Sequence, residues 1–112
     1  MNEIDGLLER INLLEYHQKL LLQLLLNPKL EFYKLIIEKG LTEKEVKDFF
    51  QLCDKMSIQL EEQKAEGYVY FHPLFNEFAD SLPKNLSVDE AIMACLTQNL
   101  YEFLFQELKK YI

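Results

Sequence analysis

The sequence predicts an all-α protein, a multihelical bundle of about five helices with a long first and a long last helix, and three observations lead to that prediction. Apolar side chains recur at helical spacing along most of the 112 residues. Two stretches carry complete signatures of a helix N-terminus, and the three glycines and three prolines are few enough to mark helix ends. A chain of this length is expected to form one domain, residues 1–112, and can bury a core without metal or disulfide cross-links.

The first helix is predicted from about Asn2 to residue 26, and its apolar residues follow a heptad repeat. They occupy positions a, d and e, with Gln18 as the one polar member, a residue type that can set the register of a coiled coil. After Lys19 the helix is apolar nearly all round, so it must be covered on every side. We therefore predict an oligomer interface on this side of the helix, called the heptad face, which consists of Ile4, Leu7, Leu8, Ile11, Leu14, Gln18, Leu21, Leu22 and Leu25.

Prolines and glycines mark the ends of two shorter helices. Asn27 is typical of a helix cap and Pro28 of the first helical position, so a second helix is predicted from Pro28 to the residue before Gly40. Glycine is favoured just after a helix because it adopts the left-handed conformation without strain. A short fourth helix is predicted to begin at Pro73 and to end before Pro83.

The third helix has the most complete start in the chain. Thr42 and Glu45 are spaced as a capping box, in which each side chain accepts a hydrogen bond from the backbone amide of the other residue. Gly67 is expected to end this helix. Residues 68–71 favour a strand by composition, but no second strand is available for pairing, so we predict an extended connection.

The last helix repeats the start of the third. Ser87 and Glu90 have capping-box spacing, and apolar residues at helical spacing continue from Val88 to Leu108. We therefore predict one uninterrupted helix over this range.

Residues 67–78, called the aromatic stretch, read GYVYFHPLFNEF. The spacing of its three phenylalanines predicts core positions, whereas tyrosines, with polar tips, suit a partly covered surface. We interpret the stretch as an anchor that closes on the core or on another subunit, where it would assist the heptad face. A small-molecule or peptide site around Tyr70, His72 and Phe75 is the alternative. The candidate patch for a ligand or partner consists of Tyr68, Tyr70, Phe71, His72, Phe75 and Phe78.

The charge balance argues against two classes of partner. The chain has 12 Lys and Arg against 19 Asp and Glu, and Arg10 is its one arginine. Nucleic acids and anionic membranes are bound through clustered basic residues, which are absent from the sequence. The helices on either side of Gly40 resemble a helix-turn-helix, but residues 43–56 carry three lysines against four acids. We expect neither a nucleic-acid partner nor a membrane partner.

Cysteine use and the N-terminal sequence predict a soluble, cytoplasmic protein. Cys53 and Cys95 stand at helical positions without a CxxC motif, which fits two small buried side chains in a reducing compartment. The first residues are acidic where a signal peptide would be basic. The most apolar run, residues 19–28, is too short to span a bilayer.

The sequence predicts no catalytic, metal-binding or cofactor-binding residue. Neither His17 nor His72 belongs to a metal-ligand motif, and both cysteines lie on apolar helix faces, where thiols are inert. His72 is the best candidate for a general base, but no nucleophile or third group is visibly paired with it. We therefore expect a protein that is not an enzyme, with catalysis by His72 kept as a residual hypothesis.

Three segments carry a resemblance to a known family. They are LEFYKLIIEKGLTEKEVKDFFQLCDKM at 30–56, the aromatic stretch at 67–78, and SVDEAIMACLTQNLYEFLFQEL at 87–108. Together they resemble a small uncharacterised family of short all-helical proteins from Bacillus-type bacteria. The resemblance implies a multihelical subunit intertwined with its copies into a homo-oligomer, specifically a trimer. It implies no catalytic residues, because the family has no assigned activity.

Two functions remain open at this point. The first is a homo-oligomeric interaction or regulatory scaffold, which could also bind another protein. The second is a small-molecule or peptide-binding protein with its site in the aromatic stretch.

Overall fold

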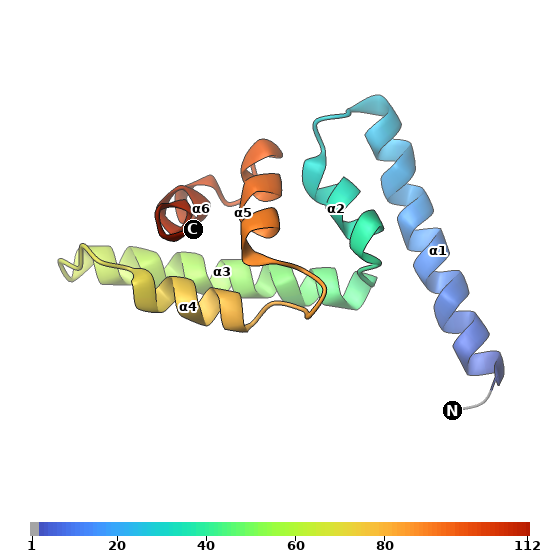
Figure 1. Ribbon diagram of the computed structural model, residues 1–112, viewed down its shortest axis with the longest axis horizontal. Helices are drawn as coiled ribbons and strands as arrows, with labels where there is room; N and C mark the ends of the chain where they lie inside the picture. The colour runs from blue at the N-terminus through green and yellow to red at the C-terminus, as the bar shows by residue number, and fades with distance from the viewer. Residues whose placement is uncertain (1–2) are drawn as a thin grey trace.

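The computed structural model describes residues 3–112, and within that range every regular element is a helix (Figure 1). This confirms the all-α class, with six α-helices in place of the five predicted. The predicted start at Asn2 lies outside the described residues. The elements are α1 (Glu3–Leu26), α2 (Glu31–Lys39), α3 (Glu43–Ala65), α4 (His72–Asp80), α5 (Val88–Thr97), α6 (Glu102–Leu108) and a final 3-10 turn, η1 (Lys109–Tyr111).

The helices form a body with α1 attached at one end. The long α3 carries α4 along one side and also packs against α6, which in turn packs against α5 (Figure 1). α2 packs between α5 and α1, so it joins α1 to the body. α1 runs along the edge of the molecule, and its N-terminal half leads away from the other helices.

A chain of aromatic rings links the helices of the body. The ring of Phe32 in α2 stacks on that of Phe49 in α3, with centroids 4.9 Å apart. Phe49 meets Phe78 of α4 edge-on at 6.0 Å, and Phe78 meets Phe105 of α6 edge-on at 5.5 Å. Stacked and edge-to-face rings add to the apolar area that they bury, so this chain of rings fixes four helices against one another.

Both predicted capping boxes are present. The hydroxyl of Thr42 accepts from the Glu45 amide at 3.1 Å, and the Glu45 carboxylate accepts from the Thr42 amide at 3.0 Å. Ser87 and Glu90 make the same reciprocal pair at the start of α5. Residues 68–71 form the predicted non-helical connection, and α4 begins with proline in its first turn as predicted.

The start of α2 was predicted wrongly, because its cap comes from another helix. Asn27 accepts a hydrogen bond from the amide two residues on and closes a turn, so the helix begins only at Glu31. The side chain of Gln98 reaches the free amides of this first turn. Its Oε1 accepts from the Phe32 amide at 2.9 Å and from the Tyr33 amide at 3.3 Å. The side-chain amide oxygen of Gln98, from another helix end, thus caps the N-terminus of α2 in place of a local residue.

The predicted last helix is divided in two at residues 98–101. Asn99 has a φ of 62°, in the left-handed region. Its amide donates to the Leu96 carbonyl at 3.1 Å, and the Leu100 amide donates to the Cys95 carbonyl at 2.8 Å. This pair of bonds is a Schellman motif, which ends a helix, and asparagine tolerates the left-handed position better than most residues. Gly40 and Gly67 end α2 and α3 in the same way, as predicted.

Tertiary hydrogen bonds hold this break in place. Gln98 caps α2, as described above. Tyr101, with a φ of 50°, donates its hydroxyl proton toward the Asp54 carboxylate, at 2.8 Å, and the hydroxyl also lies 3.3 Å from the Phe50 carbonyl. A left-handed tyrosine is strained, so these contacts offset a conformation that the local sequence disfavours.

We expect Asn99→Ala to destabilise the protein by about 1 kcal/mol, because alanine tolerates the left-handed conformation less well than asparagine. Asn99→Gly should unfold at the same or a higher urea concentration than the wild type, since glycine adopts this conformation without steric cost. Urea unfolding followed by circular dichroism measures both variants. Equal losses for alanine and glycine would contradict the role of the left-handed φ.

Candidate functional site

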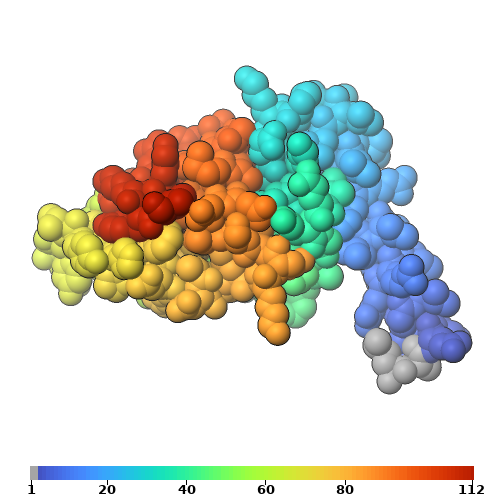
Figure 2. All heavy atoms as spheres, viewed as in Figure 1, coloured from blue at the N-terminus to red at the C-terminus, as the bar shows by residue number. Residues whose placement is uncertain are grey.

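The heptad face is an exposed strip along α1. Its side chains range from 48 % exposed at Ile11 to 66 % at Ile4 and Leu14, and to 80 % at Leu25, and Gln18 is also exposed. Figure 2 shows α1, in blue, at the edge of the molecule. No element among residues 3–112 covers this strip. An exposed apolar strip of this extent is typical of an interaction surface.

The opposite side of α1 is fixed to the body. Leu20 and His17 are buried, and the His17 Nε2 lies 2.9 Å from the Leu41 carbonyl oxygen, to which it donates a hydrogen bond. Burial raises the pKa of the neighbouring Tyr16 to about 12. Successive residues turn by about 100° around a helix, which places Tyr16 and Leu20 roughly opposite the heptad face and His17 at its edge.

The apolar residues after Lys19 predict cover on every side, but the structure covers this part of α1 only on the side of Leu20 and leaves Leu22 and Leu25 exposed. The sequence did not identify His17 as part of the attachment, because it stands out only as a histidine outside metal motifs.

The dimensions of the chain exceed those of a compact monomer. The Cα radius of gyration is 15.9 Å, against about 13 Å expected for this length. The accessible surface is 7444 Å², against about 6,500 Å² expected for a monomer of this mass. The excess is comparable to the area of roughly 800 Å² that one partner contributes to a standard interface.

The aromatic stretch is divided between core and surface. Phe71, Phe75 and Phe78 are buried, whereas Tyr68 and Tyr70 are 54 % and 63 % exposed. The stretch begins at the far end of α3, at the opposite end of the long axis from α1 (Figure 1). The two predicted surfaces therefore do not form one continuous face in a single chain.

The C-terminal turn closes over the buried part of this stretch. The hydroxyl of Tyr111 accepts a hydrogen bond from the Phe71 amide at 2.8 Å. The Tyr111 ring meets the His72 ring edge-on, with centroids 5.4 Å apart. The Tyr70 ring stacks on the His72 ring, with centroids 6.0 Å apart. Nδ1 of His72 lies 3.3 Å from the side-chain amide of Asn76. His72 is thus held by rings and an amide, an arrangement that packs the histidine.

A buried carboxylate fixes α6 beside the same loop. Glu107 is 7 % exposed and lies 3.1 Å from Lys64 Nζ and 3.2 Å from Lys110 Nζ. Burial by itself raises the pKa of this carboxyl, but hydrogen bonds to the two ammonium groups outweigh burial, and the pKa is lowered overall. Lys64 Nζ also lies 4.6 Å from the centre of the Phe103 ring and 5.8 Å from that of Phe71. These contacts tie the end of α3 to α6.

The two cysteines are placed as inert core residues. Cys53 and Cys95 are fully buried, and burial raises the pKa of both thiols well above the ordinary value. A protonated, shielded thiol is neither a good nucleophile nor a metal ligand. Within residues 3–112, no three His, Cys, Asp or Glu side chains are grouped so that they could hold a metal ion.

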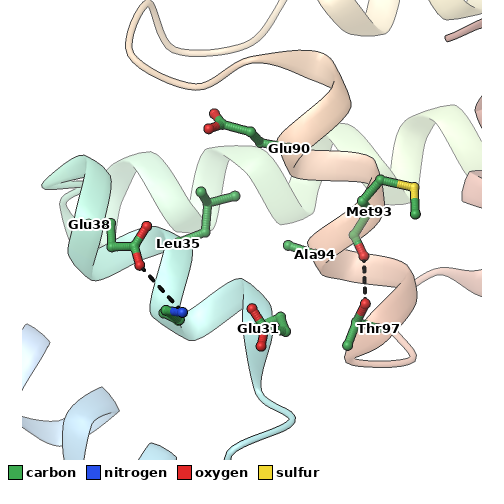
Figure 3. A pocket seen from close by; sticks show the side chains of 8 residues that line it. Glu31, Leu35, Glu38, Glu90, Met93, Ala94 and Thr97 are labelled. Atoms are coloured by element: carbon green, nitrogen blue, oxygen red, sulfur yellow. Dashed lines mark hydrogen bonds and ion pairs between the residues drawn. The ribbon is translucent and has the colours of Figure 1, made fainter.

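A groove between α2 and α5, with a volume of about 390 Å³, was not foreseen from the sequence (Figure 3). Leu35, Ala94 and Met93 supply its apolar lining, and glutamates from both helices lie along its rim. Glu38 pairs with Lys34 at 3.8 Å. The α5 carboxylate on the rim, Glu90, lies 3.2 Å from Lys39 Nζ. It also accepts hydrogen bonds in the α5 capping box, so its charge is already paired. No sequence pattern predicts this groove, because its walls come from α2 and α5, which are far apart in the sequence.

None of the helices in residues 3–112 combines the length and apolarity needed to cross a membrane.

A family model with the description "Protein of unknown function (DUF1878)" matches residues 4–112. The matched range contains the whole heptad face and the whole aromatic stretch. The description names no activity, so no catalytic or binding residue is carried over to this chain.

We expect Tyr111→Phe to lower the free energy of unfolding by about 1 kcal/mol, because the Phe71 amide loses its acceptor. Tyr68→Phe is the matched control, since it removes an exposed tyrosine hydroxyl from the same region. Urea unfolding of both variants is the measurement. Equal stability of the two variants would show that the Tyr111 hydrogen bond contributes nothing.

Glu107 should make folding stability depend on acid pH. Its pKa is lowered in the folded state, so its contribution is present above the unfolded value of about 4.3 and is lost as pH falls through the lower folded value. Glu107→Gln should therefore cost about 1 kcal/mol at neutral pH, and the difference from the wild type should shrink in acid. Thermal unfolding across a pH series measures this difference. A gap that stays constant with pH would refute the ion-pair role.

Proposed function

We propose that this chain, which belongs to the DUF1878 family of proteins of unknown function, assembles with copies of itself and works as a non-enzymatic interaction or regulatory scaffold. The observation that supports assembly most strongly is the heptad face. It is exposed along its length, on a helix whose opposite side is already buried against the body at Leu20.

A second copy is the partner that the pattern of this face favours. Apolar residues at heptad spacing pack into the equivalent holes of another helix with the same repeat. Each leucine or isoleucine removed from water contributes about 1.5–3 kcal/mol, so burial of several can outweigh the roughly 4–15 kcal/mol lost on association. The net charge of −7 disfavours an anionic membrane as the alternative cover.

We propose a trimer as the order of assembly, with intertwined subunits, as the family resemblance of the sequence implies. Leu8 and Leu22 at position e widen the face beyond a two-helix seam, which gives each helix area for two neighbours. Ile4 and Ile11 at position a are also common in two-stranded coils, so the measured mass decides between two and three copies. We place the assembly in the cytoplasm of a bacterial cell, where unpaired thiols such as Cys53 stay reduced.

Absence of enzymatic activity is part of the proposal. The buried thiols with raised pKa and the packing of His72 against rings and Asn76 support it. A catalytic histidine needs a group within reach whose proton it can move, and the contacts described for His72 supply none.

A second candidate function rests on the exposed tip of the aromatic stretch. Tyr68, Val69 and Tyr70 are consecutive exposed side chains, with Val69 89 % exposed. They lie at the end of the body remote from α1, so they would stay accessible when the heptad face is covered (Figure 1). We propose this tip as the place where the scaffold meets a different protein or a peptide, since exposed aromatic residues are enriched in interfaces.

Leu14→Asp should convert the assembly into folded monomers. Leu14 is 66 % exposed in the single chain, so the charge is tolerated in the monomer but not in a buried heptad layer. Size exclusion with light scattering gives the mass, and circular dichroism gives the helix content. Asn12→Asp is the matched control, because it adds the same charge to an exposed position outside the heptad face. An unchanged mass for Leu14→Asp would exclude the heptad face as the interface.

A further inference from the structure

We infer that the α1 helices of neighbouring copies pack parallel and in register, with Arg10 of one copy beside Glu15 of the next. This inference rests on the proposed self-association through the heptad face and adds its orientation. Two independent features carry it, the two flanking charges and the polar Gln18 layer, and the side on which the body is attached permits it.

Arg10 and Glu15 lie along opposite edges of the heptad face. At about 100° per residue, Arg10 follows the edge that holds Leu14 and Leu21, and Glu15 follows the edge that holds Leu8 and Leu22. Both charged side chains are exposed, and neither takes part in a salt bridge within the described chain. They are therefore free to pair across an interface.

The heptad positions of these charges match only one orientation. Arg10 is at position g and Glu15 at the following position e, and in a parallel, in-register coil those two positions meet between helices. In an antiparallel pair, g lies beside g and e beside e. Glu15 would then lie near Leu8 or near a second Glu15. Arg10 could meet only one acid, Glu3 at position g, and only in a register in which the helices overlap over residues 3–10 alone.

The position of Gln18 also favours parallel, in-register packing. It occupies position a, and parallel in-register packing brings it against Gln18 of the next copy, where the two amides can hydrogen-bond to each other. Antiparallel packing sets position a against position d. Gln18 would then be buried against Leu7 or Leu14, with its amide unsatisfied, which is unfavourable.

The attachment of the body permits this arrangement. Leu20 fixes the body to the side of α1 that faces away from the heptad face. His17 has the same heptad position as Arg10, one heptad later, and bonds to the body at the edge between the two sides. Several α1 helices can therefore converge on one axis while their bodies extend outward at the same level. This is a closed symmetric arrangement, in which every copy makes identical contacts.

Single-cysteine cross-linking at the two ends of the heptad face tests the orientation. Under mild oxidation, Leu7→Cys alone and Leu25→Cys alone should each form disulfide-linked pairs, because parallel packing brings identical positions together. The wild type should stay unlinked, since both native cysteines are fully buried.

The possible outcomes separate this inference from the proposed function. Assembly at the wild-type mass without a disulfide at either position would overturn parallel packing and leave self-association standing, because antiparallel packing holds identical end positions far apart. A monomer by light scattering would overturn both.

Charge exchange tests the pairing of Arg10 with Glu15. Arg10→Glu and Glu15→Arg should each weaken association by about fivefold, since each places like charges together. The double variant should recover affinity close to that of the wild type. Analytical ultracentrifugation at low salt measures the dissociation constants. A double variant that is no tighter than either single variant would overturn the pairing.

Discussion

The α1 helix is apolar on two sides, and a single chain covers only one of them. His17 and Leu20 hold α1 against α2 and the connection that follows it. The other side, the heptad face, lies at the edge of the molecule. The extended shape follows from this constraint, because a helix that kept both sides for its own chain would have to pass through the body. A surface of this kind is costly in water, so the form of the chain favours a partner.

The body depends on side chains from its C-terminal part. Gln98 caps α2, Tyr101 bonds to α3, and Tyr111 bonds to the backbone at the start of α4. Each bond satisfies or orients a group at a helix end or beside another helix, where backbone groups lack local partners. The C-terminal part therefore sets the relative positions of helices that precede it in the sequence. The surface that would join copies, on α1, is separate from this set of contacts.

The two candidate surfaces differ in length and in secondary structure. The heptad face is regular and long, which suits a permanent contact with an identical helix. The tip at Tyr68 and Tyr70 is short and non-helical, and its neighbours are anchored by Phe71 and by the pair of Glu107 and Lys64. An exposed tip on a fixed base suits a contact with a different partner. The groove between α2 and α5 has its carboxylates largely engaged by lysines, so it offers less to a ligand.

The sequence by itself determined the features that depend on neighbouring residues. The all-α class, both capping boxes, the helix ends at Gly40 and Gly67 and the spacing of the heptad face all arise from periodicity and short-range hydrogen bonds. Tertiary structure alone decided the start of α2 and the choice of which side of α1 is buried, and it holds the break whose local Schellman motif is at Asn99. Gln98 and Phe32 are 66 residues apart, and no local sequence pattern predicts the hydrogen bond between them. The left-handed Tyr101 is likewise held by Asp54 in another helix. Contacts between distant residues therefore overrode local preference where the two conflicted.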